Sequence, residues 1–339
     1  MKFAAEYIWL DANNNFRSKI RTLDTEDTVI PEWNYDGSST GQADINCSEI
    51  ILKPCCTFKN PLLKDSKNLN KIILCATYTT DNKPLKNNYY HSAKELFDEK
   101  PEEHPWYGLE QEYFMISNAD KSNKVNNVIG YDSSYNEGIY YCSPLQQHQT
   151  CVKISEEHLM ACYEAEINIS GINAEVSPGQ FEFQIGPCEG INAGNHMMVA
   201  RYLLEKIAIK YDVGISYNPK IHPRLSGSGC HTNFSTKSMR EENGLTHIMD
   251  AIKRLELNHS NDILNYGVNN DKRLTGACET ANIKTFSHGI GTRNTSIRIG
   301  YDTFNNKMGY FEDRRPAANC DPYLVSSTIF KTCCLYFFY

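Results

Sequence analysis

The sequence lacks several features that would place it in a familiar class. No apolar run approaches the ~20 residues that a helix needs to span a bilayer. The opening MKFAAEYIWLD holds an apolar run that Glu6 interrupts, unlike a secretory signal. The chain contains no Gly-Lys dipeptide and therefore no Walker A loop, and it has no CxxC or HExxH spacing. We expect neither a membrane segment, nor a P-loop, nor a zinc centre.

Positive charge is also in short supply. The chain has 34 Lys and Arg residues against 41 Asp and Glu residues, which gives a formal net charge of −7. Nucleic acids and anionic membrane surfaces both bind clustered Lys and Arg. We therefore expect no nucleic-acid partner and no membrane partner.

Cysteine is plentiful, but its pattern does not indicate disulfides. There are 13 cysteines, an odd number, and they include the adjacent pairs Cys55–Cys56 and Cys333–Cys334. A disulfide framework typically has an even number of cysteines in a short secreted chain. We expect reduced thiols and a cytoplasmic location.

The length of 339 residues, with 40% hydrophobic residues, suggests about two domains. The N-terminal part is rich in strand formers, in the runs EYIWLD and KIILCATYT, and the turn-rich EWNYDGSSTG lies between them. The following stretch 79–88 is polar and contains Pro84. We place the boundary there, between a domain of residues 1–84 and a domain of residues 85–339.

Helices are expected at several places in the second domain. Ser92 to Glu95 and Ser238 to Glu241 resemble capping boxes, which open helices. Ser155, followed by two Glu residues, predicts a third helix start. Residues 195–211 and 245–255 each place apolar side chains on one helical face.

Short strands lie between these helices and carry charges where core residues would be expected. In GLEQEYFMI, Glu110 and Glu112 are two residues apart, so on a strand they point to the same face, about 7 Å apart. In FEFQI, Glu182 points away from its apolar neighbours, and Glu175 precedes it across a Pro-Gly turn. In YFEDRRP, Glu312 shares a face with the arginine two residues later.

Each of these carboxylates alone could lie on the solvated face of an antiparallel sheet. Several on adjacent strands are harder to explain in that way, because buried like charges cost several kcal/mol (~3–5) unless they are neutralised. Oxygen ligands suit Mg²⁺ or Mn²⁺, and a single histidine fits Mn²⁺ or a mixed site. The pattern favours divalent metal binding.

The C-terminal half also gathers arginines in short motifs, at Arg273, Arg293, Arg298, Arg314 and Arg315. Each could form an ordinary surface salt bridge. Carboxylates, divalent ions and several arginines together are what phosphoryl transfer requires, because developing charge must be stabilised.

One motif suggests a different chemistry. GSSTG at residues 37–41 matches G-x-S-x-G, the nucleophile elbow of α/β-hydrolases. That elbow needs a helix after it, whereas QADINCS follows here, which is polar and has no helical periodicity. The acidic Asp36 just before the glycine favours an acidic loop instead.

Seven motifs together resemble glutamine synthetase of the eukaryotic type, and they occur in the family's order from about Glu6 to about Thr332. They are PEWNYDGSSTGQA, HPWYGLEQEY, NAEVSPGQFEFQIGPCEGI, GSGCHTNFSTKSMREENGL, RLTGACETANI, TSIRIG and GYFEDRRPAANCDPY. The resemblance implies an α+β fold, with a small N-terminal β-grasp-like domain followed by a large catalytic α+β domain with a curved antiparallel sheet. It also implies a homodecamer of two pentameric rings with active sites between subunits.

The activity implied is that of an ATP-dependent ligase in glutamine biosynthesis and nitrogen metabolism. L-Glutamate, ammonia and ATP would give L-glutamine, ADP and phosphate through γ-glutamyl phosphate. ATP would be a substrate, and two or more Mg²⁺ or Mn²⁺ ions would serve as cofactors.

The resemblance also implies roles for individual residues. Metal ligands match Glu112, Glu175 and Glu182 for one ion, and Glu110, His231 and Glu312 for another. Glutamate-binding positions match Arg273, Arg314, Ser226, Gly227 and His231. Nucleotide-binding positions match Trp106, Pro187, Ser235, Arg298 and Tyr310, and catalytic positions match Asp36, Glu279, Arg293 and Arg298.

The chain departs from the family pattern at a few positions. Ser226 stands where the family usually has Asn, so a polar contact to glutamate could be lost or bridged by water. Ala and Cys precede Glu279 in place of Phe and His, and Gly300 replaces a Pro. Every implied metal ligand and phosphate-binding arginine is present. Two alternatives stay open: a non-catalytic structural relative, and a γ-glutamylamide synthetase that uses another amine.

Overall fold

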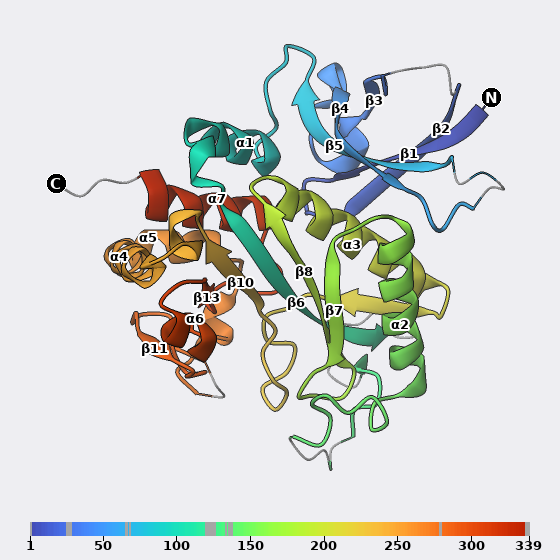
Figure 1. The fold of residues 1–339 in the computed structure, drawn as a ribbon. Helices are drawn as coiled ribbons and strands as arrows, with labels where there is room; N and C mark the ends of the chain where they lie inside the picture. The colour runs from blue at the N-terminus through green and yellow to red at the C-terminus, as the bar shows by residue number, and fades with distance from the viewer. Residues whose placement is uncertain are drawn as a thin grey trace.

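The computed structural model describes residues 2–24, 29–64, 67, 69–118, 127–132, 134, 138–277 and 280–335. Its strands form a five-stranded sheet in the N-terminal part and an eight-stranded sheet in the remainder. Figure 1 shows helix α3 (Asn192–Ile209) between the two sheets. Within the described ranges, no helix is both long enough and apolar enough to cross a membrane.

The five-stranded sheet confirms the strand-rich N-terminal region. Its order is β2-β1-β5-β4-β3, in which β1 and β5 run parallel and the other neighbours antiparallel. β-Branched and aromatic residues dominate the central strands, where both faces are covered. The strands are β1 (Lys2–Leu10), β2 (Phe16–Asp24), β3 (Trp33–Asp36), β4 (Glu49–Lys59) and β5 (Lys71–Thr79).

The eight-stranded sheet has the order β11-β12-β13-β10-β6-β8-β7, and β9 pairs with the far end of β6. It is antiparallel as predicted, except that the short edge strands β11 and β12 run parallel. With the helices, this confirms the α+β class. The strands are β6 (Trp106–Ser117), β7 (Ile169–Ala174), β8 (Gln180–Glu189), β9 (Val213–Ser216), β10 (Cys230–Ser235), β11 (His288–Ile290), β12 (Ile297–Ile299) and β13 (Phe311–Asp313).

Besides α3, the longer helices are α1 (Tyr89–Glu99), α2 (Gln149–Glu164), α4 (Gly244–Leu257) and α7 (Pro322–Phe330). Shorter ones are α5 (His259–Asp262) and α6 (Tyr301–Asn306). Single turns of 3₁₀-helix lie at Gly37–Thr40, Ile45–Cys47, Pro101–Glu103, Ser238–Arg240, Ile263–Asn265 and Asn270–Lys272, and a π-helical turn lies at Lys331–Leu335. The amphipathic patterns at 195–211 and 245–255 correspond to α3 and α4.

The three helix starts predicted from serine were wrong. Ser92 lies inside α1, where its hydroxyl donates to the Tyr89 carbonyl. Ser155 lies well inside α2, whose first turn is capped by the His148 ring. After Ser238 the chain makes a 3₁₀ turn, and α4 begins only after Asn243 in the left-handed conformation. Serine side chains can bond the backbone inside a helix as well as at its end, so the motif alone does not place a start.

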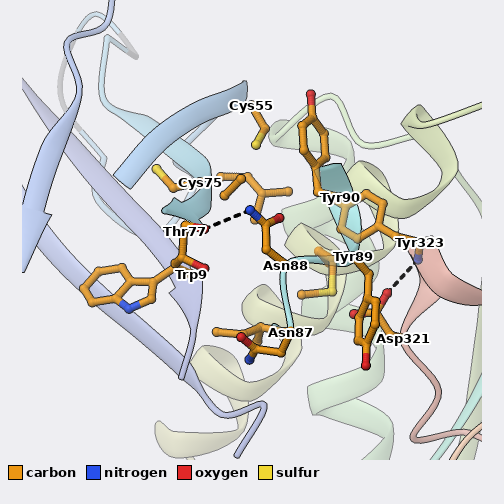
Figure 2. A pocket seen from close by; sticks show the side chains of 14 residues that line it. Trp9, Cys55, Cys75, Thr77, Asn87, Asn88, Tyr89, Tyr90, Asp321 and Tyr323 are labelled. Atoms are coloured by element: carbon orange, nitrogen blue, oxygen red, sulfur yellow. Dashed lines mark hydrogen bonds between the residues drawn. The ribbon is translucent and has the colours of Figure 1, made fainter. Parts of the chain in front are cut away.

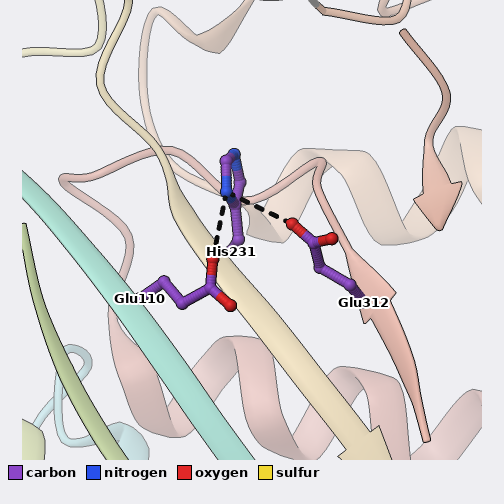
Figure 3. Close-up of side chains that lie close together, drawn as sticks. All are labelled: Glu110, His231 and Glu312. Atoms are coloured by element: carbon purple, nitrogen blue, oxygen red, sulfur yellow. Dashed lines mark ion pairs between the residues drawn. The ribbon is translucent and has the colours of Figure 1, made fainter. Parts of the chain in front are cut away.

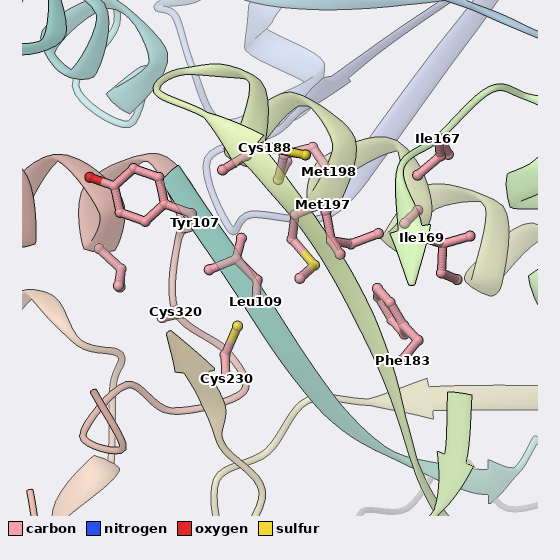
Figure 4. Close-up of a cluster of buried hydrophobic side chains, with 14 of the residues drawn as sticks. Tyr107, Leu109, Ile167, Ile169, Phe183, Cys188, Met197, Met198, Cys230 and Cys320 are labelled. Carbon is pink, nitrogen blue, oxygen red and sulfur yellow. The ribbon is translucent and has the colours of Figure 1, made fainter. Parts of the chain in front are cut away.

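One face of the large sheet is apolar and packs against α3. Figure 4 shows Leu109 of β6, Phe183 of β8, and Met197 and Met198 of α3 in this core. Side chains alternate between the two faces of a strand, so residues next to these point to the opposite face. The core therefore directs the even-numbered residues of β6 and β8, which include Glu110, Glu112 and Glu182, away from α3.

The two sheets meet at a shared core. Ile8 of β1 packs in the same apolar cluster as the large sheet and α3, whereas Tyr7 and Trp9 face a separate cluster within the first sheet. Buried Glu6 accepts hydrogen bonds from Tyr202 of α3 (2.5 Å) and from Asn60 (2.7 Å). This packing joins the N-terminal sheet to α3 through both apolar and polar contacts.

A small cavity of about 40 Å³ lies at the same junction. Figure 2 shows Trp9 on one side of it and Tyr90 and Tyr323 on the other, with Asn88 donating to the Thr77 carbonyl (2.9 Å). The predicted boundary at residues 84 and 85 falls between β5 and α1. The division into two domains at that point stays a prediction.

Candidate functional site

The first carboxylate cluster lies on the face of the large sheet that points away from α3. Glu112 of β6 and Glu182 of β8 are directly paired in the sheet, and Glu175 follows the end of β7. One oxygen of each lies within 4.8 Å of the others. The sheet register and the turn between β7 and β8 bring these three predicted ligands together.

The second cluster joins β6, β10 and β13. His231 of β10 is paired with Glu110 of β6. Asn233, two residues further along β10, is paired with Glu312 of β13. The Nδ1 atom of His231 lies 3.6 Å from Glu110 Oε2 and 3.5 Å from Glu312 Oε1. Figure 3 shows the imidazole between the two carboxylates. The three residues offer ligand atoms within 4.8 Å of one another.

Burial disfavours the ionised form of these carboxylates. Burial raises the pKa of Glu182 to about 9, with further contributions from Glu110, Glu112 and Glu175. Burial and then the charge of Glu175 raise the pKa of Glu112 to about 8. A divalent cation would replace the missing solvation of these groups.

Neighbouring groups orient the side chains of both clusters. The Gly229 backbone N–H donates to Glu112 Oε2 (2.6 Å), and the Asn233 amide donates to Glu110 Oε1 (2.7 Å). Burial, and then the positive charge of Arg314, hold the pKa of His231 well below its ordinary value. A neutral imidazole among carboxylate oxygens is a donor set that fits Mg²⁺ or Mn²⁺.

We predict that the stability of the metal-free chain falls as the pH rises from about 6 to about 8. The pKa values of Glu112 (about 8) and Glu182 (about 9) lie above the ordinary 4.5, so the folded state holds protons in this range that the unfolded state has released. Mg²⁺ should raise the Tm more at the higher pH, because fewer protons must be displaced. Thermal melts in EDTA and in Mg²⁺ test this, and an equal Mg²⁺ effect at both pH values would contradict it.

Arginines border the second cluster. Arg314 Nη1 donates to Glu312 Oε1 (2.6 Å), and Arg298 Nη1 lies 3.3 Å from Glu312 Oε2. Within the described residues, Arg298 Nε is buried without a hydrogen-bond partner. Exposed Arg293 is linked to this group because its carbonyl accepts from Arg314 Nε (3.0 Å). Arg298 and Arg314 therefore lie together at Glu312, and the backbone of Arg293 is joined to them through Arg314.

Arg273 is held by hydrogen bonds to backbone carbonyls. Its Nη2 atom donates to the carbonyls of Arg314 (3.0 Å) and Arg315 (2.8 Å). Burial lowers its pKa to about 10, so it remains charged at neutral pH. Its guanidinium is fixed by the backbone of the chain that follows β13.

Two glycines let the loop 226–231 approach this arginine. A Cβ on Gly227 would lie 2.6 Å from Arg273 Cγ, and a Cβ on Gly229 would lie 2.9 Å from His231 Nε2. Any larger residue would push these side chains apart. Ser226 begins the loop and is anchored there, because its N–H donates to the Ser177 hydroxyl (2.9 Å).

A cleft of about 420 Å³ opens beside the second cluster. Four of the five predicted nucleotide-binding residues line it: Trp106, Pro187, Ser235 and Tyr310. The fifth, Arg298, is not among the described residues that line it and lies with the arginines at Glu312.

Arg240 also lines this cleft, and sequence reasoning missed it. Its guanidinium lies 4.0 Å from the centre of the Trp106 ring and donates to the Ser235 hydroxyl (3.0 Å). The spacing of five residues from Ser235 has no strand or helix periodicity, because a 3₁₀ turn intervenes. Only its position in a polar stretch after β10 could have suggested it.

One predicted catalytic residue, Asp36, is not brought to this site within a single chain. Asp36 lies at the end of β3, in the upper sheet of Figure 1, away from β10 and β13. The hydroxyls of Ser38 (2.6 Å) and Ser39 (2.7 Å) donate to it, and these bonds lower its pKa to about 2. The two serines of the G-x-S-x-G motif therefore donate their hydroxyls to Asp36 and lie in a 3₁₀ turn, so the motif forms no nucleophile elbow. Glu279 lies outside the described residues.

Comparisons with known proteins agree with this geometry. Residues 92–334 match the family model described as glutamine synthetase, catalytic domain. A putative glutamine synthetase of Acanthamoeba polyphaga mimivirus is 48% identical over 97% of this chain and 93% of its own length. The glutamine synthetase cytosolic isozyme 1-1 of Oryza sativa subsp. japonica is 46% identical (98% and 94%), and the glutamine synthetase of Homo sapiens is 42% identical (98% and 90%).

A solved structure titled "Apo GmaS without ligand" has a similar fold, with a TM-score of 0.76 over 97% of this chain and 76% of that one. At 17% identity it supports the fold alone. The family model spans most of the chain, and the relatives match it nearly end to end at identities above 40%. Together with the site geometry, these matches show that the chain belongs to the glutamine synthetase family.

Proposed function

We propose that this chain is a glutamine synthetase, an ATP-dependent ligase that amidates L-glutamate with ammonia through γ-glutamyl phosphate. The observation that carries the proposal is the pair of three-residue clusters on one sheet face, with arginines at Glu312 and a cleft beside the second cluster. A non-catalytic relative would have no need for buried carboxylates whose charge destabilises the fold.

The roles proposed for the metal ions and the arginines follow from the negative charge of both substrates. Glutamate and ATP are both anions that repel each other, and bound Mg²⁺ or Mn²⁺, two or more per site, would lower that repulsion and stabilise the phosphoryl oxygens. Arg273 and Arg314 would bind the carboxylates of glutamate, beside Ser226 and Gly227. Arg293 and Arg298 would contact phosphate oxygens, and the free Nε–H of Arg298 supports that role.

The nucleotide would lie in the cleft next to the second cluster. Trp106 is 42% exposed and Tyr310 is 52% exposed, so both rings are available to a bound base. Aromatic and guanidinium faces stack on a purine. Together with Pro187 and Ser235, these rings form the base-binding part of the cleft.

Ammonium would be bound by two carboxylates, one of them offered by a neighbouring subunit. Asp36 lies at the surface of the N-terminal sheet, where it could face the site of a neighbouring subunit. Glu279 would be the second carboxylate and would take the proton that ammonium must lose before it attacks. We accordingly propose a homodecamer of two pentameric rings in the cytoplasm, and native mass spectrometry tests the assembly.

The test of function is formation of γ-glutamyl hydroxamate from glutamate, ATP and hydroxylamine, with Mg²⁺ or Mn²⁺. Activity that requires all three substrates and the metal is expected. A well-folded protein that forms no hydroxamate would overturn the proposal. A higher kcat/KM for methylamine than for ammonium would replace it with a γ-glutamylamide synthetase.

Replacing Ser226 with Asn is expected to lower the KM for glutamate about threefold, because the amide could restore a polar contact in the glutamate loop. The Ser226 backbone bond to Ser177 does not depend on the side chain, so the loop should keep its position. Initial rates at varied glutamate measure the change, and the KM for ATP is the internal control. An unchanged KM for glutamate would show that this position does not contact the substrate.

A further inference from the structure

A buried histidine joins two segments of the site without belonging to either. His259 of α5 is 8% exposed. Its Nδ1 atom lies 3.1 Å from Arg315 Nη1, and its Nε2 atom lies 2.9 Å from the carbonyl oxygen of Ile283. A guanidinium has only donors, so Nδ1 must accept and the proton must be on Nε2, which donates to Ile283. Burial and then Arg315 lower the pKa of His259, which agrees with a neutral ring.

Each partner of His259 is tied to one of the arginines proposed to bind glutamate. The N–H of Ile283 donates to the Leu274 carbonyl (2.9 Å), and Leu274 directly follows Arg273. Arg315 directly follows Arg314, and the Arg315 carbonyl accepts from Arg273 Nη2 (2.8 Å). The imidazole therefore lies behind both arginines and connects the chain on either side of them.

Arg315 does not need the histidine to stay in place. Its Nε and Nη2 atoms already donate to both oxygens of Asp313 (2.9 and 2.6 Å). The bond from Nε2 to Ile283 is different, because it fixes the segment after Arg273 to this anchored ion pair. Loss of that bond should change the spacing of the two arginines more than it changes the ion pair.

We propose that His259 is a positioning residue that sets the spacing between Arg273 and Arg314, and so the affinity for glutamate. The inference rests on the proposed function, since it assumes that these arginines bind the substrate. The planar imidazole, with an acceptor at Nδ1 and a donor at Nε2, spans the gap between Arg315 and Ile283.

The test compares His259→Asn with His259→Gln. The Asn oxygen can accept from Arg315, but its amide is too short to reach Ile283, whereas the longer Gln amide can donate to Ile283. We expect the Asn variant to raise the KM for glutamate about tenfold with the KM for ATP within about twofold. The Gln variant should restore most of the affinity for glutamate.

A matched control is His158→Gln. His158 is also buried, and its Nε2 atom lies 3.0 Å from the Ala200 carbonyl oxygen, but it packs on Phe183 on the α3 side of the sheet. Its replacement should lower the Tm and leave both KM values unchanged. KM does not depend on the fraction of active enzyme, so it separates positioning from simple destabilisation.

The outcomes are distinct. An Asn variant with an unchanged KM for glutamate, or one whose KM for ATP rises equally, would overturn the inference while leaving the proposed function intact. If the Asn variant does not fold, a Gln variant whose KM for glutamate is raised tenfold would overturn it equally. Wild-type protein that forms no glutamine would refute the proposed function instead.

Discussion

The Glu182→Gln variant is expected to lose glutamine synthesis by about 10²- to 10³-fold, the usual loss when a charged group that stabilises a transition state is removed. The substitution keeps the shape of the side chain and removes its charge. Glu182 is paired with Glu112 in the sheet and completes the first carboxylate cluster. Steady-state kcat at saturating glutamate, ATP and Mg²⁺ measures the effect.

The same variant should have a higher Tm than the wild type when metal is absent. The raised pKa of Glu182 (about 9) means that its ionised form is unfavourable in the folded chain at neutral pH. A neutral amide removes that cost, so activity and metal-free stability are expected to move in opposite directions. A simple structural defect would lower both.

Glu189→Gln is a matched control for Glu182→Gln. Glu189 lies on the same strand, β8, but it is exposed and lies 2.8 Å from the ring of His104, away from the clusters. Its replacement should leave kcat and the metal-dependent shift in Tm unchanged. A Glu182→Gln variant that keeps activity within tenfold of this control would rule out a metal-ligand role for Glu182.

The second large effect is on stability. Arg315→Met should destabilise the fold by ~3–5 kcal/mol, because it leaves the Asp313 carboxylate buried without its counter-charge. Arg315 Nη2 lies 2.6 Å from Asp313 Oδ2, and the two side chains are 1% and 0% exposed. The Tm is expected to fall by roughly 10 °C, measured at a fixed scan rate.

Two comparisons identify the cause. Replacing both partners, as Asp313→Leu with Arg315→Met, should recover part of the loss, because no uncompensated charge remains. Lys94→Met removes the exposed pair with Asp98 (2.6 Å) and should change stability by less than about 1 kcal/mol. If Arg315→Met were as mild as Lys94→Met, the buried pair would not stabilise this fold.

Strand periodicity was a good guide to the site, and helix-capping motifs were not. Glu110 and Glu112 share a face because side-chain direction in a strand depends only on odd or even position. Helix starts depend on which of several local hydrogen bonds a serine makes, and Ser92 makes one within a helix. Arg240 was missed because a 3₁₀ turn, which has neither period, carries it to Trp106.

The amino-acid order alone predicts which acids, arginines and glycines are available and which strand residues point to the same face. Which of them meet depends on how the strands pair in three dimensions. Glu110, His231 and Glu312 come from distant parts of the chain and are brought together only by the register of β6, β10 and β13. The position of His259 behind the arginines likewise depends on packing between distant segments, because a hydrogen-bond partner is selected by distance in space and leaves no periodic signal in the sequence.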